Sequence, residues 1–262
     1  MTGYIGEAVS QALATDGFIW VCAIVSAALV LRAAIGFGDG LIAVPLLSLI
    51  VDVSEAVPTI LFLSTTMSLY PLWKDRSHIQ LGSLGRTSIA AFVGIPLGVV
   101  LLGWGNDSLM KGALGALLIA LAWWQLRTPA QTRLEWSGWS YIFGTAAGVL
   151  GSAYALRGTV FSVYGALRGW GPKKFKGTIN AFYVVSGILI PITYFGAGLI
   201  TPRIVGFYLV ILPLAVLATM LGYRVTDRVD ATVFKRWLWM LLFGLGFVLI
   251  VRMFLASTAA TA

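Results

Sequence analysis

Five long apolar blocks limit most strongly what this chain can fold into. They are residues 17–35, 86–103, 176–198, 203–222 and 236–255, each about 18–23 residues long with few charged side chains. A helix of about 20 apolar residues crosses roughly 30 Å of hydrocarbon. Only 11% of the residues are charged, whereas soluble domains carry about a quarter. The blocks therefore predict an all-α polytopic membrane protein.

Two further apolar segments are too short to cross a bilayer. Residues 41–51 and 158–168 would reach about 16 Å as helices, which is half a bilayer, so we expect half-helices. The expected elements are 17–35, 41–51, 56–73, 86–103, 109–126, 138–153, 158–168, 176–198, 203–222 and 234–255.

Basic residues in the connecting segments predict the orientation. If each expected helix takes the chain to the opposite side of the membrane, thirteen lysines and arginines fall on one side and three on the other. The thirteen are Lys74, Arg76, Arg86, Arg127, Arg133, Arg168, Lys173, Lys174, Lys176, Arg224, Arg228, Lys235 and Arg236. Because basic loops stay in the cytoplasm, we expect a multi-pass protein of a bacterial inner membrane with both termini periplasmic. This topological role explains the net charge of +8, so no nucleic-acid partner is expected.

The two halves resemble each other weakly. Each has a span, a glycine-rich break, a half-helix and three further spans. Gly40 and Gly158 lie 118 residues apart, and Thr59 and Thr178 lie 119 apart. Five passages per half predict two inverted repeats, with a binding site near the midplane at the broken helices. The expected divisions are a periplasmic segment 1–16, repeats 17–126 and 138–255, a cytoplasmic linker 127–137 and a periplasmic tail 256–262.

Three charged residues, Arg32, Asp39 and Arg157, fall inside the predicted membrane region, where ionisable groups are costly and often functional. Asp39 begins the first half-helix. It could cap that helix, couple transport to a proton or cation, or pair with Arg32 or an arginine of the other half. Arg32 could bind substrate or only extend to the cytoplasmic headgroups.

Arg157 begins the second half-helix, and this position predicts an anion site. Helix N-termini attract anions, and a guanidinium adds a planar fork for oxyanions. A structural ion pair with Asp39 is the alternative. The expected substrate-binding residues are Arg157, Gly158, Thr159, Gly36, Gly38, Asp39, Gly40, Ser152, Tyr154, Asn180 and Arg32. No catalytic residue, metal or cofactor is expected, because the single histidine, His78, lies in a loop and no His/Cys cluster occurs.

Motifs at these positions resemble the TauE/SafE family of sulfite and organosulfonate permeases. Gly36–Pro45 and Glu55–Thr59 match a first copy of the pattern, and Tyr164–Pro172 with Phe175–Thr178 resembles a second. The chain departs from the family where Asp39 replaces a usual glycine, and where Arg157 and Thr159 replace prolines beside Gly158.

The resemblance implies transport of a small anion, sulfite or a C2 organosulfonate such as sulfoacetate, by alternating access. A channel or facilitator stays open as an alternative, as does a carboxylate or another sulfur oxyanion as substrate. The expected partners are the anion and the lipid bilayer. Proton or cation coupling and a homodimer also stay open.

Overall fold

The computed structural model describes residues 2–127, 136–225 and 231–259, and these residues form helices and short connections. Its elements are α1 (Thr2–Leu13), α2 (Phe18–Ile35), α3 (Asp39–Leu47), α4 (Val53–Asp75), the 3-10 turn η1 (Arg76–His78), α5 (Leu81–Trp104), α6 (Asp107–Arg127), α7 (Trp139–Tyr154), α8 (Arg157–Leu167), α9 (Pro172–Gly196), α10 (Pro202–Val225) and α11 (Ala231–Ala259). The predicted all-α fold is confirmed.

The membrane prediction is also confirmed. Within the described ranges, α2, α5, α6, α9 and α10 are long and apolar enough to cross a bilayer. Large apolar side chains point outward from the bundle, among them Phe92 and Leu97 on α5 and Ile192 on α9. In water such exposure would be unfavourable, but these residues lie where lipid tails would surround the protein.

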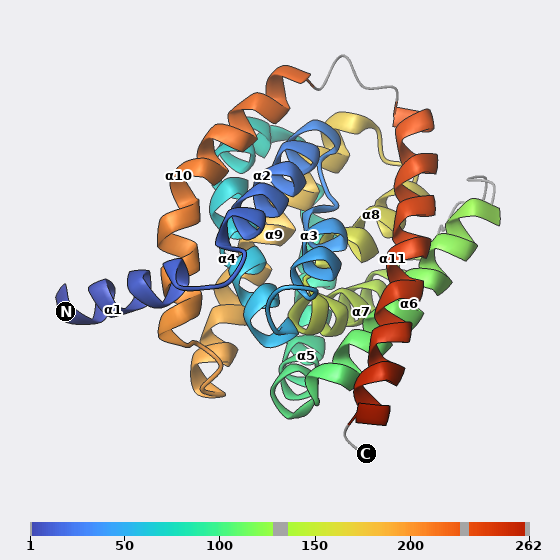
Figure 1. The fold of residues 1–262 in the computed structure, drawn as a ribbon. Coiled ribbons are helices and arrows are strands. Elements are labelled where there is room, and N and C mark those ends of the chain that lie inside the picture. Colours follow the sequence, from blue (N-terminus) through green and yellow to red (C-terminus); the bar gives the residue numbers. More distant parts are fainter. Residues whose placement is uncertain (1, 128–135, 226–230, 260–262) are drawn as a thin grey trace.

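Both half-helices are present near the middle of the bundle (Figure 1). Two glycines with positive φ, Gly36 at 102° and Gly38 at 101°, separate α2 from α3. Ala155, with φ of 57°, ends α7 before α8. Left-handed backbone stops a right-handed helix, so each half-helix starts where the chain has been forced to turn.

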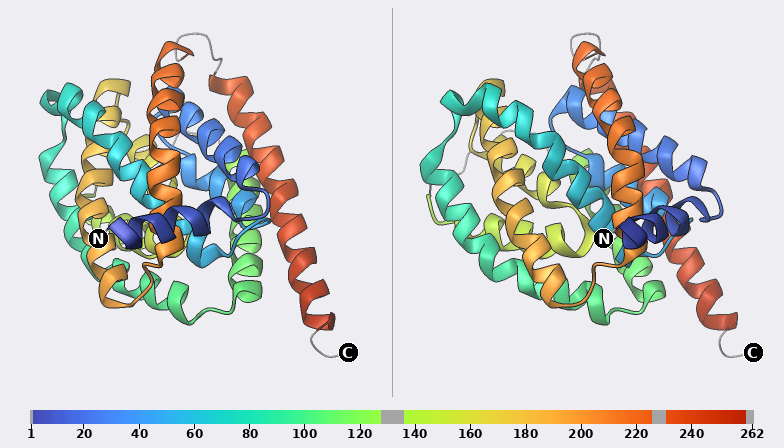
Figure 2. Two further views of the ribbon diagram at one scale, coloured as in Figure 1. Left: turned by 60° about the vertical axis from the view of Figure 1, so that its left-hand side comes forward. Right: turned by 90° about the vertical axis from the view of Figure 1, so that its left-hand side faces the viewer.

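The N-terminal segment contains a helix that sequence analysis did not predict. Helix α1 lies across α10 (Figure 2), with Ala8 and Ala12 fully buried. Gly206 of α10 sits so close to the backbone of Ala8 that a larger residue would collide with it. Residues four apart share one helix face, so the spacing of the two alanines was the available signal.

Helix pairs pack in a matched pattern. Glycines bring α5 against α7 at Gly94 and Gly148, α10 against α2 at Gly222, and α6 against α11 at Gly115 and Gly246. If α2 to α6 are matched in order with α7 to α11, then α5 corresponds to α10 and α7 to α2. The α5–α7 pair therefore corresponds to the α10–α2 pair, and the α6–α11 pair corresponds to itself. This packing is expected of two related halves, while their inverted relation stays a prediction.

Some of the basic residues predicted to be cytoplasmic lie together at one end of the bundle. The end of α4, the start of α9 and the end of α10 come together there, carrying Lys74, Lys176 and Tyr223. Arg133 and Arg228 lie outside the described residues, as do most of the 127–137 linker and residues 260–262 of the tail.

Candidate functional site

Asp39, the first residue of α3, is buried in a shell of donors. Its side chain is 2% exposed. The Ser64 hydroxyl donates to Oδ2, and the Tyr183 hydroxyl donates to Oδ1 at 3.0 Å. Arg32 Nε lies 3.5 Å from Oδ2. Of the interpretations open for Asp39, the ion pair with Arg32 is the one observed.

Arg32 approaches Asp39 from the last turn of α2. It is only 5% exposed, so it does not extend to the headgroups. Its Nη2 donates to the Ser68 hydroxyl at 2.5 Å and to Asn180 Oδ1 at 3.3 Å. The guanidinium carbon lies 4.4 Å from the centre of the Tyr183 ring, a distance at which the ring attracts a cation.

Arg157 begins α8 and is 1% exposed. Its Nη1 donates to Ser186 at 3.1 Å, and its Nη2 donates to Thr65 at 2.9 Å and to the Leu61 carbonyl at 3.2 Å. Its guanidinium carbon lies 4.7 Å from the centre of the same Tyr183 ring. Arg157 therefore shares Tyr183 with Arg32, and the observed ion pair of Asp39 is with Arg32.

We call Arg32, Asp39, Arg157 and Tyr183 the charge cluster. It contains two arginines and one aspartate, so its formal charge is +1. Neither Arg32 Nε nor Arg157 Nε has a hydrogen-bond partner among the described residues. A buried uncompensated charge is costly, and a small anion bound here would offset it.

The beginnings of both half-helices lie at this cluster. A Cβ on Gly40 of α3 would collide with the Ala155 carbonyl at the entry to α8, and one on Gly158 would collide with the Tyr183 hydroxyl. The N-terminus of a helix carries free N–H groups and a partial positive charge. The N-termini of α3 and α8 therefore add to the positive potential of the cluster.

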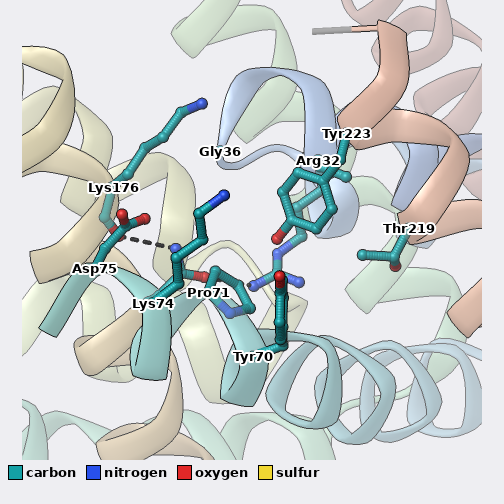
Figure 3. A pocket seen from close by; sticks show the side chains of 11 residues that line it. Arg32, Gly36, Tyr70, Pro71, Lys74, Asp75, Lys176, Thr219 and Tyr223 are labelled. Atoms are coloured by element: carbon teal, nitrogen blue, oxygen red, sulfur yellow. Dashed lines mark hydrogen bonds between the residues drawn. The ribbon is translucent and has the colours of Figure 1, made fainter.

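A pocket of about 340 Å³ leads to the cluster from one end of the bundle. It lies between α2 and α4 of the first half and α9 and α10 of the second. Figure 3 shows Lys74, Asp75 and Lys176 on one side, with Arg32 and the tyrosines on the other. Its lining residues are Arg32, Ala33, Gly36, Tyr70, Pro71, Lys74, Asp75, Lys176, Asn180, Thr219 and Tyr223. Arg32 therefore belongs to both the pocket and the cluster, and the pocket residue Asn180 accepts a hydrogen bond from it.

The deciding observation is a match over residues 20–249 to the model of the sulfite exporter TauE/SafE family. The chain belongs to this family. No curated protein and no solved structure matches it. TauE/SafE proteins are membrane transporters rather than a class of enzymes, and the family indicates transport of an anionic sulfur compound.

Some expected site residues of this TauE/SafE protein lie elsewhere. The Ser152 hydroxyl donates to the carbonyls of Ile95 and Gly148 and joins α7 to α5. The Tyr154 hydroxyl points to Met110 Sδ at 3.5 Å. Thr159 is buried in the first turn of α8, and among the described residues its side chain makes no hydrogen bond to the cluster. The structure thus brings together Arg32, Asp39, Asn180, Arg157 and Gly158, but not these three.

Sequence reasoning missed the neutral residues that hold the cluster. Ser64 and Ser68 of α4 and Tyr183 and Ser186 of α9 contact the three charged side chains. Each pair is spaced three or four residues apart, so its members share one helix face. Polar residues at that spacing inside an apolar span were the signal that could have found them.

Proposed function

We propose that this protein is a secondary transporter that moves a small anion across the bacterial inner membrane by alternating access. Sulfite or a C2 organosulfonate is the proposed substrate. The observation that carries the proposal is a buried cluster of two arginines and one aspartate, formally +1, whose Arg32 lines a pocket. Such a site attracts an anion and leaves room for it.

Arg32 is the proposed anion contact. It lines the pocket and lies beside Asn180, whose amide can donate to an oxyanion. Arg157 lies deeper and does not line the pocket. We propose that Arg157 supplies positive charge from beside Tyr183 in this state and reaches the anion only after rearrangement.

Alternating access is supported by an asymmetry between the two ends of the bundle. The pocket opens at the end carrying Lys74 and Lys176, which is the proposed cytoplasmic side. At the other end, Arg203 of α10 pairs with Glu55 of α4 at 3.2 Å and donates to Thr15 at 3.1 Å. These contacts hold the two halves together there, so the described state is proposed to face the cytoplasm.

The test begins with binding to purified protein. Titration with sulfite, methanesulfonate, sulfoacetate and acetate should show saturable binding of at least one anion. Arg32→Gln should abolish it, because both the charge and the donor fork are lost. Arg76→Gln is the matched control, since Arg76 lies on η1 at the same end but outside the pocket. Binding that survives in folded Arg32→Gln protein would move the site elsewhere.

Proteoliposome counterflow then separates a transporter from a channel. Preloading vesicles with unlabelled anion should accelerate entry of labelled anion. The internal anion binds the inward-facing carrier, which then returns to the outward-facing state with its site occupied. Uptake that is unaffected by preloading and does not saturate would replace the carrier with a facilitator.

A further inference from the structure

We propose that Asp39 sets the valence of the anion, so that the cluster accepts singly charged oxyanions and disfavours doubly charged ones. This inference rests on the proposed function, because it concerns the same site. It adds a property that the transport activity alone does not imply, namely that a carboxylate inside an anion site acts as a charge filter.

Asp39 already occupies donors that an incoming oxyanion would seek. Its Oδ2 accepts a hydrogen bond from Ser64 and lies 3.5 Å from Arg32 Nε, and its Oδ1 accepts one from Tyr183. A carboxylate held in this way behaves as an anion fixed to the protein. An anion that reaches Arg32 from the pocket must therefore share the guanidinium with Asp39 or displace the carboxylate from it.

The charge count then decides which anion fits. Arg32 and Arg157 contribute two positive charges, and Asp39 removes one. A singly charged anion brings the total to zero. A doubly charged anion leaves an excess negative charge beside Asp39, in a site whose charged side chains are at most 5% exposed. Water screens charges poorly at such depth, so the imbalance strongly disfavours binding.

The charges at the pocket mouth do not supply this discrimination. Lys74 is exposed, and Lys176 and Asp75 are half-exposed, so solvent and salt screen them. They attract any anion towards the pocket. Selection by valence therefore belongs to the buried cluster, and Asp39 is its only acidic member.

The experiment compares methanesulfonate with sulfate, two tetrahedral anions of similar size with charges of −1 and −2 near neutral pH. Dissociation constants are measured for purified wild-type protein and for Asp39→Asn, which keeps the side-chain shape and removes one negative charge. Wild type should bind methanesulfonate more tightly. In Asp39→Asn the ratio of the two constants should shift towards sulfate by about a hundredfold, as expected for one unit charge close to the anion in a poorly solvated site.

Two further variants serve as controls for this result. Asp75→Asn makes the same charge change at the half-exposed side of the pocket and should shift the ratio less than about threefold, because solvent screens it. Asp39→Glu keeps the charge and should keep the preference for methanesulfonate. If Asp39→Asn does not fold, wild-type protein that binds sulfate as tightly as methanesulfonate would still overturn the inference.

Three outcomes would overturn the inference. Wild-type protein could bind sulfate as tightly as methanesulfonate, or folded Asp39→Asn could keep the wild-type ratio. Either result removes the charge filter while leaving anion transport intact. Failure of wild-type protein to bind any tested anion would instead overturn the proposed function, and the filter with it.

Discussion

Replacing Arg157 with methionine tests whether this residue acts by charge or by contact. Methionine is unbranched and of similar length, so Arg157→Met fills much of the same buried space but lowers the net charge of the cluster from +1 to zero. The hydrogen bonds to Ser186, Thr65 and the Leu61 carbonyl are lost as well. If Arg157 acts by charge, anion affinity should fall although Arg157 does not line the pocket.

The size of the fall follows from the geometry. Both guanidinium carbons lie within 5 Å of the Tyr183 ring centre, at 4.4 Å for Arg32 and 4.7 Å for Arg157. An anion held at Arg32 would then lie on the order of 8 Å from Arg157. One unit charge at that distance and an effective dielectric constant of about 20 contributes about 2 kcal/mol, or roughly a thirtyfold loss of affinity.

The assay is titration of purified protein with methanesulfonate, in parallel with a thermal melt that confirms folding. The double variant Arg157→Met/Asp39→Asn restores the net charge to +1, so its affinity should return to within about threefold of wild type if charge alone matters. Arg157→Lys keeps the charge and should behave similarly. Failure of both variants to recover affinity would refute the charge argument and show that the guanidinium fork itself holds the anion.

Three other predictions concern packing, the cluster and orientation. Gly40→Ala should lower the melting temperature by an amount equivalent to about 1–3 kcal/mol, because the added Cβ would collide with the Ala155 carbonyl. Gly85→Ala is the control and should melt like wild type, because a Cβ there has open space. Equal melting temperatures for the two variants would contradict the close approach at Gly40. Tyr183→Phe keeps the ring near both guanidiniums but removes a donor to Asp39. A thermal melt should show a loss of about 1.5–3 kcal/mol, and an unchanged melt would be the contrary result. Alkaline phosphatase fused after Ala262 should be active and green fluorescent protein dark, since the basic loops predict a periplasmic C-terminus; a fluorescent fusion would reverse the orientation.

Much of the fold followed from short-range features of the chain. The apolar blocks predicted the long helices because each must satisfy its own backbone hydrogen bonds in lipid. The breaks before α3 and α8 were predicted from their glycines, and two of them, Gly36 and Gly38, adopt positive φ. Helix α1 was missed because a short helix packed by Ala8 and Ala12 has no long apolar run.

The candidate site was only partly predictable for a related reason. Arg32, Asp39 and Arg157 stood out because charges are rare in apolar spans. Which of them pair, and through which neutral partner, depends on how α4 and α9 pack against the half-helices. Ser152 and Tyr154 were expected at the site because they lie near Arg157 in sequence, but their hydroxyls face other neighbours.

The sequence by itself determined that this chain lies in a membrane, where its helices break, and that three ionisable groups are buried, because hydropathy and backbone freedom are properties of each segment. Only the tertiary structure decided that Arg32, rather than Arg157, lines the pocket and that Tyr183 contacts both arginines. Those relations join residues up to about 150 positions apart, and segments so distant meet only through the packing of whole helices.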